Sequence, residues 1–254
     1  MRLDDFDFAL PRDRIAQQPA SPRDSAKLLV VGDGVSDRRV SDLPAILQPG
    51  DMLVVNETKV IPVRLSGRRG GVSVSVTLHT DLGEGRWLAF AKPGRRLREG
   101  DRIDFADDFS ATVGEKTPDG SVALDFERSA DALFGALEAH GAMPLPPYIR
   151  REAEGKASDR NDYQTMFAAQ RGAIAAPTAG LHFTPDLMAQ LASQGIGCTR
   201  ITLHVGIGTF LPVKAERLED HQMHAEFGVV TEEAAATINA ARAAGGRIVA
   251  VGTT

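Results

Sequence analysis

The sequence predicts an α/β fold that is interrupted by a small antiparallel β module. Three observations support this prediction. Strand and helix patterns alternate in the last third of the chain, short alternating strands fill residues 64–126, and a buried-strand pattern precedes them. Strand–helix–strand order is typical of parallel sheets, whereas closely spaced alternating strands are typical of barrels and sandwiches. We therefore expect the β module to be an insertion in an α/β domain.

Two strand patterns define the first half of the chain. Residues 51–56 form a short apolar run after the turn Gln48–Gly50, as expected of a central strand. In the module, Val72–Leu78 alternates apolar and polar residues strictly, which predicts a half-buried strand. Further strands are expected at residues 86–92, 101–105, 111–113 and 122–126. Because turn residues separate them, the module is expected to be a small barrel or sandwich.

The second half of the chain carries clear helix signals. Ser129 is a suitable N-cap for a helix over residues 130–140, and Gly141 is a suitable end. Thr184 and Thr231 are expected to cap helices over residues 185–194 and 232–244. Strands are expected at residues 172–176, 198–205 and 247–251. The chain stops directly after the last of these strands, so we expect it to be part of a longer protein.

The composition excludes several classes of protein. The 254 residues are 43% hydrophobic and 25% charged, which is ordinary for a globular chain and unlike a disordered or fibrous one. No apolar run approaches the roughly 18 residues that a membrane-spanning helix needs. Residues 1–8 are acidic and lack the apolar core of a signal peptide. Cys198 is the single cysteine and cannot form an internal disulfide, so we expect a cytoplasmic protein.

The charge is distributed unevenly. The whole chain has a net charge of −5, but residues 64–102 hold nine basic and four acidic residues. Arg95, Arg96 and Arg98 are the densest part of this basic segment. Such a segment is either a solvated arginine-rich surface or a surface that contacts phosphates.

Two histidine-containing loops follow predicted strands. Residues 177–184 include Gly180 and His182, and residues 204–210 include Gly206 and Gly208 around a Gly-x-Gly pattern. In open α/β sheets, ligands bind beyond the carboxyl ends of the strands, and glycines allow close backbone approach. The alternative is that both loops are simple connections with core histidines.

Other polar groups leave their roles open. His221, His224 and Glu226 could serve as acid–base groups or as polar core residues, and no spacing here defines a metal site. Hydrogen-bonding side chains are concentrated in residues 159–165 and 56–59. Helix capping and substrate contact would explain them equally well. Residues 12–19 and 21–24 are either exposed loops or surfaces that contact anions.

Several sequence blocks resemble those of one enzyme family. The blocks are residues 24–29, 50–65, 144–149, 163–165, 175–184, 203–210 and 221–226, in order along the whole chain. They are similar to the S-adenosylmethionine:tRNA ribosyltransferase-isomerases of queuosine biosynthesis. The resemblance implies that ribosyl is transferred from S-adenosylmethionine to 7-aminomethyl-7-deazaguanine at the tRNA wobble position. Isomerisation then gives epoxyqueuosine, with adenine and methionine released. The resemblance also implies an inserted β-barrel, a reaction that needs no metal, and a chain that continues past residue 254.

The combined prediction is a Rossmann-like α/β domain, residues 1–63 and 142–254, with an inserted antiparallel β-barrel domain, residues 64–141. His182 and His204 are the expected acid–base groups, oriented by His224 or Glu226. The expected substrate-binding residues are Asn56, Tyr163, Gln164, Thr178, Gly180, Gly206, Gly208 and Thr209. The expected tRNA-binding residues are Arg95, Arg96, Arg98 and Tyr148. S-adenosylmethionine is expected as co-substrate, tRNA as partner, and the protein as a monomer.

Two other functions remain open from the sequence. An S-adenosylmethionine-dependent methyltransferase would release S-adenosylhomocysteine instead of adenine and methionine. A non-catalytic tRNA-binding fragment would bind tRNA and consume nothing. The enzymatic prediction requires that the segments ending near residues 176 and 205 lie side by side, so that their turns can enclose S-adenosylmethionine.

Overall fold

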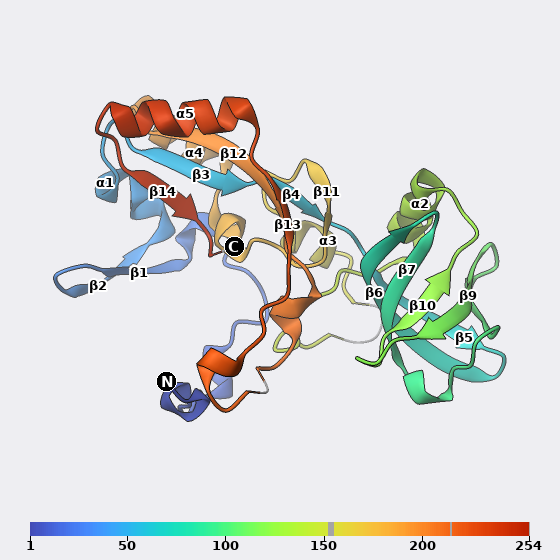
Figure 1. The fold of residues 1–254 in the computed structure, drawn as a ribbon. Helices are drawn as coiled ribbons and strands as arrows, with labels where there is room; N and C mark the ends of the chain where they lie inside the picture. Colours follow the sequence, from blue (N-terminus) through green and yellow to red (C-terminus); the bar gives the residue numbers. More distant parts are fainter. Residues whose placement is uncertain (152–154, 214, 254) are drawn as a thin grey trace. The chain divides into compact units, whose positions relative to one another are not determined.

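The computed structural model describes residues 1–151, 155–213 and 215–253, which form two compact units (Figure 1). The first unit contains residues 1–60, 147–149 and the described part of 162–254, and the second contains residues 61–146 and the described part of 150–161. The chain therefore leaves the first unit, builds the second and returns. The predicted domain limits at residues 63 and 142 stay a prediction.

A mixed four-stranded sheet forms the centre of the first unit. Its order is β13 (Phe227–Val229), β12 (Gly197–His204), β3 (Met52–Asn56) and β14 (Ile248–Val251). β3 is parallel to both β12 and β14, whereas β13 pairs antiparallel with β12. The predicted parallel α/β arrangement is confirmed. β13 was not predicted, because its residues are exposed and show no buried pattern.

Capped helices pack on this sheet. The hydroxyl groups of Thr184 and Thr231 accept hydrogen bonds from the third residue of α4 (Pro185–Ser193) and α5 (Glu232–Ala243), as predicted. Leu187 and Leu191 of α4 share a buried cluster with Leu53 and Val55 of β3. Each such side chain contributes about 1.5–3 kcal/mol by leaving water. α1 (Leu43–Ile46) is a single turn, and no helix among the described residues is long and apolar enough to cross a membrane.

Two strand pairs in the first unit differ from the sequence prediction. The hairpin β1 (Lys27–Val31) and β2 (Val35–Arg39) was not predicted, because apolar residues lie on both faces of β1 and hide the alternation. The strand expected at residues 172–176 is β11 (Gln170–Ala173), which pairs parallel with β4 (Thr58–Val60). The strand ends early because Ile174 and Ala175 turn away to bond Val205.

The second unit is a closed antiparallel barrel. Its strands are β5 (Arg64–Arg69), β6 (Val72–Gly83), β7 (Arg86–Lys92), β8 (Arg102–Ala106), β9 (Phe109–Lys116) and β10 (Val122–Asp125). The order β10-β7-β6-β5-β8-β9 closes through the β9–β10 ladder, so the module is a barrel and not a sandwich. Alternate residues of these strands are buried inside, as the period-two pattern predicted.

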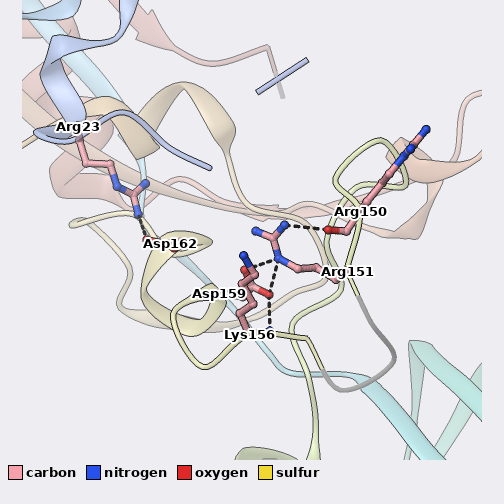
Figure 2. Close-up of polar contacts among 6 residues, drawn as sticks. All are labelled: Arg23, Arg150, Arg151, Lys156, Asp159 and Asp162. Atoms are coloured by element: carbon pink, nitrogen blue, oxygen red, sulfur yellow. Dashed lines mark hydrogen bonds and ion pairs between the residues drawn. The ribbon is translucent and has the colours of Figure 1, made fainter. Parts of the chain in front are cut away.

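Residues that follow the barrel strands complete the second unit. α2 (Ala130–His140) begins at the predicted cap Ser129 and ends at Gly141, where a side chain would collide with the Pro62 carbonyl. Asp159 is the first residue of α3 (Asp159–Asp162). Its two carboxylate oxygens accept hydrogen bonds from Arg151 Nε, at 2.9 and 3.0 Å (Figure 2). Both side chains are buried, so this pair neutralises charges that could not stay buried alone.

Asp51 joins the starts of β3 and β14. Its buried carboxylate accepts hydrogen bonds from the Gln48 amide at 2.7 Å and from Arg247 Nε at 2.8 Å. The hydrogen bond with Arg247 is the main cause that lowers the Asp51 pKa from 3.8 to about 2. The folded state therefore favours the charged form of Asp51 more strongly than the unfolded chain does.

Replacing Asp51 by asparagine should reduce the stability of the α/β unit at neutral pH by about 1–3 kcal/mol, the usual effect of breaking a buried charged hydrogen bond. Because the folded pKa is the lower one, the Asp51 contribution is full above about pH 4 and is lost as the pH falls toward 2. Urea unfolding at pH 7 and pH 3 measures both effects. Asp37→Asn on exposed β2 is the control, and an equal pH dependence in Asp51→Asn and the parent chain would contradict the assignment.

Candidate functional site

The ends of β11 and β12 lie next to each other in the first unit. The amides of Ile174 and Ala175 donate to the Val205 carbonyl, at 2.8 and 3.2 Å. Both segments come after parallel-paired strands, so the loops that follow them begin at one place. The predicted adjacency of these two segments is confirmed. The loops carry His182 on one side and His204 to Thr209 on the other.

His204 is the most closely held of the predicted residues. Its Nδ1 lies 2.8 Å from the hydroxyl oxygen of Thr58, and its ring stacks on Phe227 with 6.2 Å between ring centres. Gly172 has a φ of +146°, and a Cβ there would lie 2.8 Å from both Cε1 and Nδ1 of His204. Burial lowers the pKa of His204 below its usual value, so the neutral ring is favoured.

The Gly-x-Gly loop packs against the segment that holds His224 and Glu226. The amide of Gly206 donates to Glu226 Oε1 at 2.7 Å. A Cβ on Gly208 would lie 2.8 Å from Cδ2 of His224, so the imidazole occupies the space that a side chain would need. The structure thus brings His204, His224 and Glu226 to one loop. Gly208 therefore allows close approach of the His224 side chain, which belongs to the protein itself.

His182 lies on the 3-10 turn Thr178–His182 between β11 and α4. Burial, followed by the positive charge of Arg23, lowers the pKa of His182. Among the described residues, no hydrogen bond, ion pair or ring contact joins His182 to His204. The two predicted acid–base groups therefore share a region but not a direct contact.

Arg23 ties two of the predicted segments together. Its guanidinium group donates to the Leu181 carbonyl at 3.2 Å. It also donates to Asp162 Oδ1 at 3.4 Å, the contact drawn in Figure 2. Leu181 precedes His182, and Asp162 precedes Tyr163. Sequence reasoning noted residues 21–24 only as a possible anion surface. No sequence pattern links residues 23, 162 and 181, so only the fold could reveal this role.

The segment 163–165 is buried beside this turn. Burial raises the pKa of Tyr163 to about 12, so its phenol stays protonated. The side-chain amide of Gln164 bonds the backbone of Val60 in both directions, at 3.0 and 2.7 Å. Gly180 packs on Thr165, whose buried hydroxyl has no hydrogen-bond partner among the described residues. Thr165 was not among the predicted substrate-binding residues.

Asn56 bonds backbone groups only. Its Nδ2 donates to the Leu203 carbonyl at 2.8 Å, and its Oδ1 accepts from the amides of Leu203 and Thr58, both at 3.0 Å. These bonds connect the end of β3 with the end of β12. Asn56, predicted to contact substrate, therefore has its hydrogen bonds committed to holding the strand that carries His204.

The remaining predicted residues lie on exposed surfaces. Thr178 and Thr209 are exposed on the two strand-end loops, and the Tyr148 side chain is 55% exposed. Arg95, Arg96 and Arg98 are exposed on the barrel unit. Their guanidinium groups form no hydrogen bond or ion pair with any described residue. The ion pair of Arg69 with Asp101, at 2.8 Å, and the Arg98 amide bonded to Asp101 hold this turn in place.

No metal centre is found within the described ranges. Among those residues, no group of three or more His, Cys, Asp or Glu side chains is arranged to hold an ion. The titratable side chains that the structure brings to the two strand-end loops are His182, His204, His224 and Glu226. Their chemistry is proton transfer and hydrogen bonding.

Parallel strands that deliver histidines and glycine loops to one edge, with a separate β-barrel in the same chain, define an α/β protein with a strand-end site. Comparisons with known proteins show to which family of such proteins the chain belongs. The family model described as queuosine biosynthesis protein matches residues 3–254. The chain belongs to this family.

Similar relatives carry one name. The S-adenosylmethionine:tRNA ribosyltransferase-isomerase of Rhodospirillum rubrum is 57% identical over 255 residues, which is all of this chain and 73% of that protein. The protein of that name from Caulobacter vibrioides is 52% identical over 275 residues, all of this chain and 75% of that protein. The S-adenosylmethionine tRNA ribosyltransferase structure from Thermotoga maritima is 29% identical, with a TM-score of 0.41, and the match covers 96% of this chain and 68% of that one. The first two relatives identify an enzyme family of transferase and isomerase activity.

Gly172→Ala should displace the His204 ring. The added Cβ would overlap the imidazole, so the hydrogen bond to Thr58 should break and the His204 NMR resonances should shift. Gly245→Ala is the matched control, because Gly245 has a φ of +85° but open space around it. Both variants should lose about 1–2 kcal/mol from backbone strain. Unchanged His204 resonances in Gly172→Ala would show that the ring does not depend on this glycine.

Proposed function

We propose that this chain transfers and isomerises the ribosyl part of S-adenosylmethionine onto 7-aminomethyl-7-deazaguanine in tRNA, giving epoxyqueuosine-tRNA, adenine and methionine. Its membership of the queuosine biosynthesis family, matched over residues 3–254, is the observation that carries this proposal. S-adenosylmethionine is a co-substrate in this scheme, and no metal takes part. We further propose that the protein acts as a cytoplasmic monomer.

The reaction requires proton transfer in a protected site. The sulfonium group of S-adenosylmethionine acidifies the neighbouring 5′ carbon, so a base can remove a proton there while adenine departs. The amine of the modified base then bonds the ribose fragment, and a ribose oxygen displaces methionine to close the epoxide. A base, an acid for adenine and restricted water access are therefore needed.

His204 is our candidate for the base. Its lowered pKa keeps the ring neutral near pH 7, and a neutral imidazole has one nitrogen free to accept a proton. The ring bonds the Thr58 hydroxyl and stacks on Phe227, and it occupies the space beside Gly172, where no side chain competes with it. A fixed ring is what proton transfer at a defined carbon demands.

His182 is our candidate for the second acid–base group. It lies on the other strand-end loop, and its lowered pKa also favours the neutral form at pH 7. Glu226 and His224 hold the Gly206–Gly208 loop that follows His204, so we assign them an orienting role. A neutral imidazole on each loop can accept a proton, and the imidazolium formed when one of them takes the substrate proton can then donate a proton to adenine.

The surrounding loops are our candidate binding surface for S-adenosylmethionine. Thr178 and Thr209 offer exposed hydroxyl groups, and Gly180, Gly206 and Gly208 bring backbone close to the strand ends. The buried hydroxyl of Tyr163 lies in the segment that Arg23 ties to the His182 turn. We assign Asn56 and Gln164 to positioning, since their amides bond the backbone.

For tRNA, we propose that Arg95, Arg96 and Arg98 contact phosphates. Their exposed guanidinium groups lie on a turn that the Arg69–Asp101 ion pair keeps in place. The exposed ring of Tyr148 is suited to stack on an unpaired base of the anticodon loop.

His204→Ala and His182→Ala should each slow single-turnover release of adenine by about 10²–10⁴-fold, the usual contribution of a general acid or base. Chromatography of products from S-adenosylmethionine and tRNA carrying 7-aminomethyl-7-deazaguanine measures this. His140→Gln, a histidine of the barrel unit, is the control and should react like the parent chain.

The same assay separates the alternative functions. Release of S-adenosylhomocysteine would instead identify a methyltransferase. A tRNA gel shift with no consumption of S-adenosylmethionine would identify a binding fragment. Unchanged adenine release in both histidine variants would remove them from the mechanism but leave the reaction in place.

Charge reversal of Arg95, Arg96 and Arg98 to glutamate should weaken tRNA binding and reduce its salt dependence. The log–log slope should fall by about 0.7–0.9 for each phosphate that the variant no longer neutralises. Filter binding at several salt concentrations gives the slope. Lys116→Glu, an exposed base elsewhere on the barrel, is the control for a single charge reversal outside the proposed surface. An unaltered slope in the triple variant would place the tRNA surface elsewhere.

A further inference from the structure

We propose that Thr58 is a positioning residue that fixes His204 in the form with its proton on Nδ1 and its lone pair on Nε2. This inference rests on the proposed function, in which His204 is the base. Sequence reasoning noted residues 56–59 but assigned no role to Thr58.

The contact between Thr58 and His204 is short and is buried on the Thr58 side. Thr58 has no exposed surface, and its hydroxyl oxygen lies 2.8 Å from His204 Nδ1. The same hydroxyl oxygen lies 3.5 Å from the Gln170 carbonyl oxygen. Thr58 lies on β4 and Gln170 on β11, and their backbones are paired in register. The hydroxyl therefore lies between a carbonyl oxygen and a ring nitrogen.

These two neighbours decide the direction of the hydrogen bonds. A hydroxyl group has one proton to donate and lone pairs that accept, whereas a carbonyl oxygen can only accept. If the hydroxyl donates to Gln170, it must accept from Nδ1–H of His204, and all three polar groups are then satisfied. If it donates to Nδ1 instead, the Gln170 carbonyl loses this donor. The first arrangement makes two hydrogen bonds and the second makes one.

The surroundings of the pair hold it in register. Asn56 Oδ1 accepts from the amide of Thr58 and from the amide of Leu203, the residue before His204. One side chain thus fixes the backbone on both sides of the contact. Phe227 stacks on the ring, and Gly172 leaves room for it. Rotation of the ring would lose the stacking as well as the hydrogen bond.

The free nitrogen is then the reactive one. Among the described residues, Nε2 of His204 has no hydrogen-bond partner, and it is not among the buried polar atoms without one. It can therefore accept a proton from an acidified carbon, while the carbon–hydrogen electron pair stays in the substrate and adenine leaves. Protonation of Nε2 keeps Nδ1–H bonded to Thr58, so the ring need not turn during the step.

The tautomer can be measured without substrate. In the ¹⁵N-histidine-labelled chain at a pH where His204 is neutral, Nδ1 should show the shift of a protonated nitrogen and Nε2 that of an unprotonated one. His204→Gln assigns these signals among the six histidines. Thr58→Val, which keeps the shape but removes the hydroxyl, should move both shifts toward intermediate values. Thr58→Ser should restore the parent pattern.

Matched variants keep the test specific. Thr202→Val removes another buried hydroxyl, one that lies on β12, the strand that carries His204, and that bonds Glu57. This change should leave the His204 signals unchanged. A parent spectrum with the proton on Nε2 would overturn the proposal, as would a Thr58→Val spectrum identical to the parent. The parent spectrum, once His204→Gln has assigned it, tests the tautomer without any Thr58 variant, so a misfolded Thr58 variant cannot rescue the proposal.

Kinetics separate this inference from the proposed function. Thr58→Val should lower kcat for adenine release about 10–100-fold with little change in KM, and Thr58→Ser should recover most of it. If the chain releases no adenine while the tautomer pattern holds, the proposed function fails and the positioning role stands. If adenine is released and the Thr58 variants match the parent in kcat and spectrum, only the positioning role fails.

Discussion

The hydrogen bonds of one amide side chain, Asn56, hold the site together. The backbone pairing of β3 with β12 ends at Asn56, and its side chain then continues the pairing by bonding both backbone groups of Leu203. Because its Oδ1 also accepts from Thr58, the amide sets the position of the next strand as well. These bonds therefore fix the backbone positions of Thr58 and of Leu203, the residue before His204, and so bring the two side chains into contact. An amide is suited to this task because it can donate and accept at once.

Close packing around glycines gives the histidines fixed positions. The His204 ring uses the space beside Gly172, and the His224 ring uses the space beside Gly208. A side chain at either glycine would require the neighbouring imidazole to move. Packing of this kind excludes water and lowers the pKa of His204 through burial. The same contacts thus position the ring and set its protonation state, which are the two properties an acid–base group needs.

Much of the secondary structure could be predicted, because its signals are local. Thr184, Thr231 and Ser129 cap helices as expected, since a hydroxyl acting on the third amide needs only nearby residues. Alternation over a few residues predicted five of the six barrel strands, but β5 was missed because its residues are mostly polar and do not alternate. The β1–β2 hairpin was missed because apolar residues on both faces of β1 hide the alternation, and β13 was missed because its residues are all exposed. The early end of β11 depends on Val205, which lies far along the chain.

The sequence by itself determined the α/β class, the inserted β module, the basic segment and the family, because composition, periodicity and motif blocks are properties of the chain alone. Only the tertiary structure decided that Asn56 and Gln164 bond backbone, that Arg23 ties Leu181 to Asp162, and that Thr58 contacts His204. The physical reason is separation along the chain: Thr58 and His204 are 146 residues apart. No local pattern records such a pair, which strand pairing and the Asn56 hydrogen bonds together bring within hydrogen-bond distance.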